Sequence, residues 1–212
     1  MNNLFEIYRR QLVDELRKKG ISDERVLDAF AKVPRHAFVD GAMQQDSYKD
    51  NALPIGGGQT ISQPYIVALM TQALKLGKDD KILEIGTGSG FQAAILAQFS
   101  RRVYTVERNH ELAEKSRKLL RELGFQNIMF KVGDGSTGWI ANAPYDRIIV
   151  TAGGKDMPQA LVNQLADGGR MIIPLGDRTV QKLLVIDKKG TELVRSEIGD
   201  VVFVPLIGKE GW

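Results

Sequence analysis

The stretch KILEIGTGSG, residues 81–90, sets the architecture of the chain, because a short apolar run ends there in three closely spaced glycines. The run 81–85 has the length and composition of a buried strand, and the residues after the glycines predict a helix. Gly86, Gly88 and Gly90 then lie in a strand-to-helix turn, where glycine lets the backbone take positive φ values and approach a ligand closely. The stretch therefore predicts a ligand-binding loop at the carboxyl end of a strand in an α/β sheet.

Beyond this loop, short apolar runs alternate with helical segments. The runs that predict further strands are 103–106, 128–132, 147–150 and 171–175, and the segments with helical spacing are 91–98, 111–123 and 158–165. Such alternation is typical of a parallel sheet with helices on both faces. After Pro174, the runs 182–187 and 201–204 flank the turn 188–190 without a convincing helix, so we expect antiparallel strands at the sheet edge.

The residues before the loop predict two short helices and a long irregular connection. Apolar residues recur at helical spacing over 4–19, and we expect Ser22 to cap a second helix whose first turn carries Asp23 and Glu24. Over 34–63, prolines and glycines interrupt any pattern before another helix begins. A long loop of this kind commonly carries function.

Length and composition predict one ordinary globular domain. The 212 residues are 43% hydrophobic and 26% charged, which argues against a disordered chain. No apolar run approaches the roughly 18 residues of a membrane span, and the charged N-terminal residues do not resemble a signal peptide. A net charge of +3 is too small to indicate a nucleic-acid-binding protein. Because the chain has no cysteine, it has no disulfide or thiol nucleophile, and we expect it in the cytoplasm. Separately, we expect a monomer.

Glu107 supplies a second part of the predicted ligand site. It ends the strand after the glycine loop, where a carboxylate can accept hydrogen bonds from both ribose hydroxyls. Glu84 is an unusual charge at the end of a buried strand unless it faces a polar or cationic ligand. Loop and acid together fit a ligand that contains adenosine. A tight turn that binds nothing is the alternative, and the Gly-x-Gly-x-Gly spacing disfavours a nicotinamide oxidoreductase.

Three further motifs follow in order along the predicted strands. They are Gly133-Asp134-Gly135 after the third strand, Ala143-Pro144-Tyr145-Asp146 before the fourth and Asp167-Gly168-Gly169-Arg170 before the fifth. This order resembles that of the class I S-adenosylmethionine methyltransferases. The resemblance implies a Rossmann-like, doubly wound, mostly parallel sheet of seven strands with an antiparallel C-terminal hairpin and an N-terminal helical extension.

The same resemblance implies a role for each part of the cofactor site. Glu84 would lie near the methionine amino group, Glu107 on the ribose, and Asp134 with Gly135 beside the adenine. The full set of implied cofactor-binding residues is Gln59, Thr60, Ile61, Glu84, Gly86, Thr87, Gly88, Ser89, Gly90, Glu107, Arg108, Asp134 and Gly135.

The loop LPIGGGQTISQP, residues 53–64, resembles the signature of the protein-L-isoaspartate O-methyltransferases. The similarity extends over nearly the whole chain, and the further matching segments are 33–39, 133–136, 143–146, 158–161 and 202–206. It implies transfer of a methyl group from S-adenosylmethionine, leaving S-adenosylhomocysteine, to the free α-carboxylate of L-isoaspartyl residues in damaged proteins and peptides. The ester would then close to a succinimide, which initiates repair.

Site residues and boundaries follow from this resemblance. Ser62 would be the catalytic residue, and the implied substrate-binding residues are Pro54, Thr60, Ile61, Ser62 and Gln181. We expect a single domain over 1–212, with a helical extension at 1–52, a substrate loop at 53–64 and the Rossmann-like core at 65–212. The segment 151–154 reads TAGG where many members carry a run of alanines.

The implied chemistry is consistent with the residues that the chain offers. The acceptor carboxylate has a pKa of roughly 3.5 and is ionised at neutral pH, so no general base is required. The chain has only two histidines and no cluster of metal ligands, and we expect no metal. The remaining task is alignment of the reactants and exclusion of water. Ser62 would orient the carboxylate or the cofactor, although an N-cap role before Pro64 explains it equally well.

Two other functions stay open at this point. One is a class I methyltransferase of a small molecule or RNA, although the sequence lacks the basic patches with interleaved aromatics that would indicate RNA. The other is a non-catalytic module that binds an adenosine nucleoside, which would keep Glu84 and Glu107 but have no use for the loop 53–64. We expect isoaspartyl proteins and peptides as partners, and neither nucleic acid nor a membrane.

Overall fold

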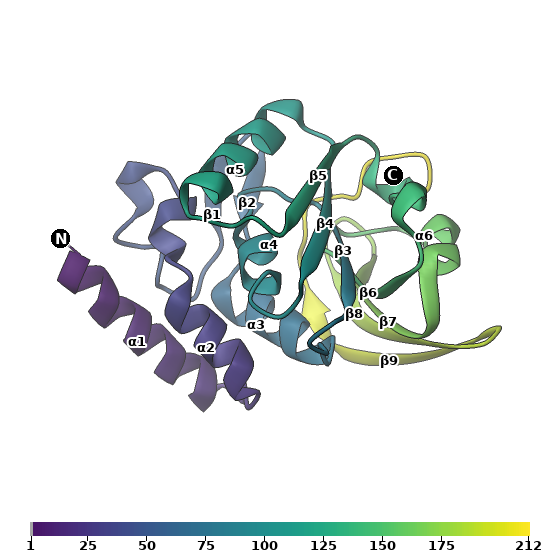
Figure 1. Ribbon diagram of the computed structural model, residues 1–212, viewed down its shortest axis with the longest axis horizontal. Coiled ribbons are helices and arrows are strands. Elements are labelled where there is room, and N and C mark those ends of the chain that lie inside the picture. Colours follow the sequence, from purple (N-terminus) through teal and green to yellow (C-terminus); the bar gives the residue numbers. More distant parts are fainter. Residues whose placement is uncertain (1) are drawn as a thin grey trace.

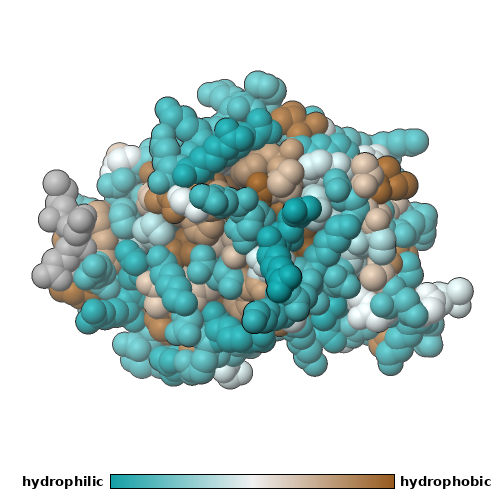
Figure 2. Space-filling model, viewed as in Figure 1, coloured by the Kyte–Doolittle hydropathy of each residue, from teal (hydrophilic) through white to brown (hydrophobic). Residues whose placement is uncertain are grey.

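The computed structural model describes the backbone of residues 2–212 and the side chains from Leu4 onward. Met1, the first residue of the expected extension, lies outside the described residues. Within the described part of the chain, no helix is both long and apolar enough to cross a membrane. Figure 2 shows a mainly hydrophilic face with small, scattered apolar patches.

A seven-stranded sheet forms the centre of the molecule (Figure 1). Its strands are β3 (Lys81–Ile85), β4 (Arg102–Glu107), β5 (Ile128–Val132), β6 (Tyr145–Val150), β7 (Leu165–Gly176), β8 (Gln181–Lys189) and β9 (Glu192–Val201). They lie in the order β5-β4-β3-β6-β7-β8-β9, parallel from β5 to β7 and antiparallel from β7 to β9. The expected seven-stranded sheet with an antiparallel edge is confirmed.

Successive residues of the central strands pack against helices on opposite faces of the sheet. The helices that follow the strands are α4 (Phe91–Leu96), α5 (His110–Glu122) and α6 (Gln159–Gln164). Ile82 is in the same hydrophobic cluster as Leu96 of α4, whereas Leu83 is in the cluster that contains Leu161 of α6. Figure 1 shows α5 and α6 on opposite sides of the sheet. The sheet is therefore buried on both faces, as parallel strands require.

The hairpin at the sheet edge differs from its prediction. Residues 201–204 were expected as its second strand, but β9 ends at Val201. Its sequence, ELVRSEIGDV, is mostly polar and exposed, because an outer strand facing water has no need of an apolar run. Residues 202–204 instead leave the sheet. Strand β7 also begins earlier than expected, at Leu165.

The N-terminal half contains more regular structure than the sequence indicates. Its elements are α1 (Asn2–Lys18), α2 (Glu24–Lys32), two 3-10 turns at Arg35–Phe38 and Gly41–Met43, β1 (Leu53–Gly56), β2 (Gln59–Ile61) and α3 (Pro64–Ala73). The two short strands pair as an antiparallel hairpin whose turn is made by glycines with positive φ. The cap of α2 is Asp23 and not Ser22, because the Asp23 side chain accepts a hydrogen bond from the backbone N–H of Arg25.

The N-terminal helices α1 and α2 pack in the same hydrophobic cluster as α4, the helix that follows the glycine loop. Leu16 of α1 and Phe30 of α2 are in one hydrophobic cluster with Phe91 of α4 and Ile61 of β2. This cluster attaches the hairpin β1–β2 to the end of the sheet at which the carboxyl ends of β3 and β4 lie. Strand β3 lies between β4 and β6, so the order of the strands along the chain reverses there. Ligands of open α/β sheets bind at such a switch point.

Candidate active site

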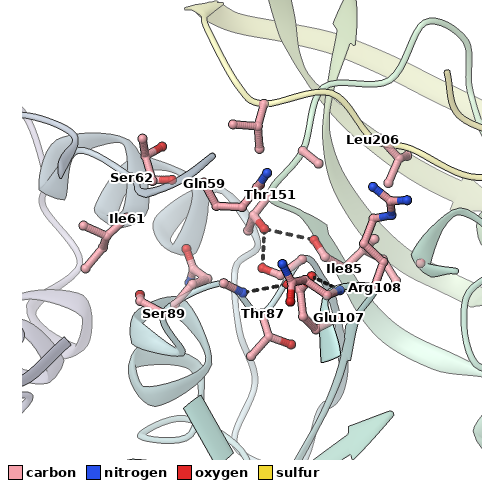
Figure 3. A pocket seen from close by; sticks show the side chains of 18 of the residues that line it. Gln59, Ile61, Ser62, Ile85, Thr87, Ser89, Glu107, Arg108, Thr151 and Leu206 are labelled. Atoms are coloured by element: carbon pink, nitrogen blue, oxygen red, sulfur yellow. Dashed lines mark hydrogen bonds between the residues drawn. The ribbon is translucent and has the colours of Figure 1, made fainter. Parts of the chain in front are cut away.

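A pocket opens at this switch point, between the hairpin β1–β2 and the carboxyl ends of β3, β4 and β6 (Figure 3). Ile61 and Ser62 lie on one side of it, Glu107 and Arg108 lie on the other, and Thr151 lies between them. The complete lining is Gly57, Gln59, Thr60, Ile61, Ser62, Val67, Met70, Ile85, Gly86, Thr87, Gly88, Ser89, Phe91, Gln92, Val106, Glu107, Arg108, Asn109, Gly135, Thr151, Ala152, Val204, Pro205, Leu206 and Ile207. We call this space the cofactor pocket.

The glycine loop lies on the floor of the cofactor pocket and is held against the end of β6. Gly86 has a φ of +96°, and a Cβ there would lie 2.5 Å from the Thr151 hydroxyl oxygen. That hydroxyl is 2.6 Å from the Gly86 carbonyl oxygen and 2.9 Å from the Ile85 carbonyl oxygen, to either of which it can donate. Only glycine fits this position, and the loop backbone is thereby exposed to a ligand.

Glu107 is fixed by two backbone groups and still has capacity to bind. Its Oε2 accepts a hydrogen bond from the Gly88 N–H at 2.9 Å, and its Oε1 accepts one from the Asn109 N–H at 2.8 Å. An ionised carboxylate has about four lone-pair positions, so two of them stay available. They can accept two hydroxyl groups of a ligand in the cofactor pocket.

Glu84 lies beneath the pocket and is fully buried. Its Oε2 accepts a hydrogen bond from the Thr105 hydroxyl at 2.5 Å, and Thr105 is in turn 2.6 Å from the Thr87 hydroxyl. Its Oε1 has no hydrogen-bond partner within the described structure. Burial, with the nearby charge of Glu107 adding to it, raises the pKa of Glu84 to about 8 despite the hydrogen bond from Thr105. A cationic group next to Oε1 would favour the ionised form.

Ser62 does not cap α3, so that interpretation of the sequence is wrong. The N-cap residue is Gln63, and its side chain makes no capping hydrogen bond. Asp50, which is distant in sequence, performs this function, because its Oδ1 accepts a hydrogen bond from the backbone N–H of Tyr65 at 2.8 Å. Ser62 is therefore not needed for the helix and lines the cofactor pocket.

A second pocket adjoins the first, and we call it the acceptor groove. It is lined by Ala52, Thr60, Ser62, Gln63, Ile66, Thr151, Val180, Asp200, Val201, Val202, Phe203 and Val204. The two pockets share Thr60, Ser62, Thr151 and Val204. We call these four residues the shared rim, and three of them carry hydroxyl groups. A small group bound in the groove can meet a ligand of the cofactor pocket at this rim.

Most of the predicted site residues come together here. The cofactor pocket contains Gln59, Thr60, Ile61, Gly86, Thr87, Ser89, Gly88, Glu107, Arg108 and Gly135, together with Ser62. Gly90 lies just behind the loop with a φ of +88°, where a Cβ would lie 2.9 Å from Leu120. The structure therefore brings parts of the predicted loop 53–64, the glycine loop and the end of β4 together at one pocket.

Neither lining includes five of the predicted residues, namely Glu84 and Gly90, described above, and Pro54, Gln181 and Asp134. Pro54 is exposed on β1, away from both linings. Gln181 is buried, and its side chain donates to the Asp177 carbonyl at 2.5 Å and accepts from the Phe203 N–H at 2.7 Å. Asp134 accepts from the Ser136 N–H and hydroxyl and from the Lys209 N–H. Hydrogen bonds tie these last two side chains to neighbouring segments of the chain.

The sequence interpretation missed the C-terminal segment 202–212 as a wall of the site. Val204, Pro205, Leu206 and Ile207 line the cofactor pocket. Backbone bonds between Gly153 and both Val204 and Leu206 fasten this wall to the end of β6. The remaining residues attach it more widely, because Lys209 binds Asp134 and the Trp212 indole N–H donates to the Gly153 carbonyl at 3.0 Å. The apolar motif 202–206 is the signal that could have identified it.

No group of three or more His, Asp or Glu side chains suited to a metal ion occurs among the described residues. The polar groups of the cofactor pocket are instead hydroxyls, backbone and side-chain amides, the Arg108 guanidinium and the Glu107 carboxylate, and Glu84 is buried outside the lining. This donor set suits a nucleoside with an amino-acid portion: hydroxyls for Glu107, a cationic amino group for Glu84 and an apolar wall for a base.

Comparison with known sequences supports one family over nearly the whole chain. The family model Protein-L-isoaspartate(D-aspartate) O-methyltransferase (PCMT) matches residues 8–211. A protein-L-isoaspartate O-methyltransferase from Dictyoglomus thermophilum is 55% identical over 208 residues, which are 98% of this chain and 94% of that protein. One from Geobacter metallireducens is 50% identical over 210 residues, with 98% and 97% covered.

Comparison with solved structures leads to the same family. A protein-L-isoaspartate O-methyltransferase superposes with a TM-score of 0.88 at 31% identity, over 96% of this chain and 67% of the other. A Plasmodium falciparum protein assigned to the same activity superposes with a TM-score of 0.81 at 25% identity, over 94% of this chain and 98% of the other. That structure was solved in complex with S-adenosyl-L-homocysteine.

Proposed function

The chain belongs to the protein-L-isoaspartate(D-aspartate) O-methyltransferase family, and we propose that it methylates the free α-carboxylate of L-isoaspartyl residues in damaged proteins and peptides, with S-adenosylmethionine as the donor. The observation that carries this proposal is the pair of adjoining pockets that meet at the shared rim. One pocket has the features of an adenosine site, and the other is open to a peptide. The methyl ester then closes to a succinimide without the enzyme, which initiates repair.

The cofactor pocket fits S-adenosylmethionine on three features of this chain. Glu107 retains two lone-pair positions for the ribose hydroxyls, and Gly86 and Gly88 of the pocket lining carry no side chain that could block the cofactor. The partnerless Oε1 of Glu84 suits the positively charged methionine amino group. When bound, the cofactor supplies an electrophilic methyl group on a sulfonium. We propose that Gly135 and the apolar wall 204–207 receive the adenine, and that Asp134 reaches its amino group through the free lone pair of Oδ2.

In the acceptor groove, the residues of the chain align a nucleophile and need not activate it. The isoaspartyl α-carboxylate is ionised at neutral pH, so the site requires no general base. We propose that Ser62 donates a hydrogen bond that orients this carboxylate at the shared rim, with Thr60 and Ile61 beside it. Val180 and Val202 are half-exposed or more along the groove and can cover the peptide against water. Catalysis then comes from alignment and from exclusion of water.

The remaining parts of the proposal concern the whole protein. We propose that 1–212 works as one catalytic unit, with 1–52 supporting the loop 53–64 from behind through their common hydrophobic cluster. We further propose a cytoplasmic monomer that acts on isoaspartyl proteins and peptides and binds neither nucleic acid nor membranes. The modest net charge of +3 supports this choice of partner.

The decisive experiment compares two peptides that differ only in the linkage of one aspartyl residue. Purified protein with methyl-labelled S-adenosylmethionine is expected to label the isoaspartyl peptide and leave the normal aspartyl peptide unlabelled, because only the former presents a free α-carboxylate. Base-labile methyl ester is the product to be measured. Equal labelling of both peptides, or of neither, would contradict the proposed function.

A further inference from the structure

Arg35 is a fully buried cation close to the active site but outside its lining. It belongs to the first 3-10 turn and is 1% exposed. Its Nε donates to the Ser47 carbonyl at 2.7 Å, and its Nη2 donates to the Ser62 carbonyl at 2.8 Å. Its guanidinium lies 4.7 Å from the centroid of the Phe91 ring, and Nη1 has no hydrogen-bond partner within the described structure.

The environment of Arg35 is costly for a charged side chain. Burial lowers its pKa to about 9, although the charges of Asp50 and Tyr48 act in the opposite direction. None of the ion pairs among residues 2–212 includes it. An apolar residue of similar size would fill the same space without the desolvation cost. The guanidinium donates hydrogen bonds to two carbonyl oxygens, which an apolar residue cannot do.

The carbonyl of Ser62 is the one that matters for the site. The segment 62–65 connects β2 to α3, and its hydrogen bonds come from outside the helix. Asp50 accepts from the Gln63 side chain at 2.9 Å and from the Tyr65 N–H at 2.8 Å. Arg35 donates a hydrogen bond to the carbonyl of Ser62, the residue immediately before Gln63. Together, Arg35 and Asp50 fix the backbone at the point where the Ser62 side chain enters the shared rim.

We propose that Arg35 is a positioning residue for methyl transfer: by holding the Ser62 carbonyl it sets the direction of the Ser62 hydroxyl between the two pockets. The inference rests on the proposed function, because Ser62 needs a defined direction only if it orients an acceptor. Arg35 lines neither pocket; its contacts with lining residues are the hydrogen bond to the Ser62 carbonyl and the packing of its guanidinium on the Phe91 ring. Arg35 makes no contact with the glycine loop or Glu107 that the structure records, so we expect cofactor binding to change little when it is replaced.

The test is a double-mutant cycle with Ser62, measured on the full chain. Arg35→Met keeps the length and removes both hydrogen bonds, and Arg35→Lys keeps the charge but places all its donors on one nitrogen. We expect kcat for the isoaspartyl peptide to fall about 10- to 100-fold in Arg35→Met and less in Arg35→Lys, with the dissociation constant of S-adenosylhomocysteine within about threefold of wild type. In Arg35→Met/Ser62→Ala, kcat should lie within about twofold of Ser62→Ala.

Arg170→Met is the matched control, because Arg170 Nη1 donates to the Ala73 carbonyl at 2.9 Å, at the other end of α3. It should lower the melting temperature but leave kcat per cofactor-binding site unchanged. If the fold-loss of kcat in the double variant equals the product of the losses in the two single variants, Arg35 only stabilises the fold. Unchanged kcat in Arg35→Met would show the same. Failure of both Arg35 variants to bind S-adenosylhomocysteine stoichiometrically would show the same. A wild type that labels neither peptide would overturn the proposed function and this role together.

Discussion

At the scale of single residues, two neighbouring carboxyl groups have different surroundings: Glu107 lines the cofactor pocket, whereas Glu84 is fully buried outside its lining. Glu107 accepts hydrogen bonds from two backbone N–H groups. Glu84 receives one hydroxyl and has no other partner within the described structure, so burial favours its neutral form. Sequence placed both at the ends of neighbouring strands, because strand and loop signals are local. The sequence could not show that the Gln181 side chain is hydrogen-bonded to the backbone of Asp177 and Phe203, because those contacts depend on the final packing.

The raised pKa of Glu84 predicts a pH-dependent stability. Its folded-state pKa of about 8 lies above the ordinary value of 4.5, so the folded state binds the proton more tightly than the unfolded chain. The contribution of this carboxyl to stability is full below pH 4.5 and is lost as pH rises towards 8. In Glu84→Gln this loss is absent. The free energy of unfolding of the variant should therefore rise relative to wild type between about pH 5 and 8.

Urea titrations of the unliganded proteins at several pH values measure this difference. Glu122→Gln is the control, since Glu122 is exposed on α5 and pairs only loosely with Lys118 at 3.9 Å. Its curve should run parallel to that of wild type. A Glu84→Gln curve that also runs parallel to wild type would show that Glu84 is ionised in the unliganded protein.

At the scale of elements, helix α3 shows how a local interpretation can be physically reasonable and wrong. Ser62 precedes Pro64 in the pattern of a capped helix, but the cap is Asp50. Most strands with apolar runs were located to within two residues, because burial on both faces gives them a strong signal, but β7 begins six residues before the expected run 171–175. Strand β9 was misplaced, because an exposed outer strand carries charges. The hairpin β1–β2 was expected as a loop because glycines dominate its turn.

Asp50 should therefore matter more than an ordinary surface carboxylate. Its side chain is 10% exposed and pairs with Lys19, Gln63 and the Tyr65 N–H. Burial alone would raise its pKa, but these hydrogen bonds together lower it, so its stabilising effect is present at neutral pH and is lost on acidification. Asp50→Ala should reduce the free energy of unfolding at pH 7 by about 1–2 kcal/mol.

The measurement is urea unfolding at pH 7, with Asp46→Ala as the control. Asp46 forms an exposed ion pair with Lys49 three residues away, and its removal should change stability by less than about 0.5 kcal/mol. If both variants lost the same stability, the cap of α3 would have to be supplied by another group.

At the scale of the whole molecule, the site is assembled from segments that are remote in sequence. The hairpin β1–β2, the glycine loop and the C-terminal segment 202–212 meet only at the switch point of the sheet. The sheet itself was predictable, since alternating strands and helices allow few topologies. The closing of the cofactor pocket by 204–207 was not, because it depends on bonds between residues about 50 or more positions apart.

The residues beyond this wall should control how well it closes. A variant lacking 208–212 loses four hydrogen bonds. The backbone N–H groups of Lys209 and Glu210 donate to Asp134 and Ser136, the Glu210 carboxylate accepts from the Ala160 N–H, and the Trp212 indole donates to the Gly153 carbonyl. Each lost hydrogen bond contributes about 0.5–1.5 kcal/mol to holding the wall in place. Loss of part of this free energy from binding is enough to raise the dissociation constant of S-adenosylhomocysteine tenfold or more. Isothermal titration calorimetry measures this directly.

Arg178→Ala is the control for this truncation, because Arg178 only stacks on the Trp212 ring at 5.0 Å. Its affinity for S-adenosylhomocysteine should stay within about twofold of wild type. Unchanged affinity in the truncated protein would show that the bonds of Val204 and Leu206 to Gly153 hold the wall without help.

The shared rim makes the enzyme modular for protein engineering. Among the described residues, the cofactor pocket and the acceptor groove share only Thr60, Ser62, Thr151 and Val204. The other residues of the acceptor groove, such as Ile66, can thus be randomised in a library while the cofactor pocket stays intact. Selection for new carboxylate acceptors could proceed on a constant methyl supply, with the rim left as the fixed junction.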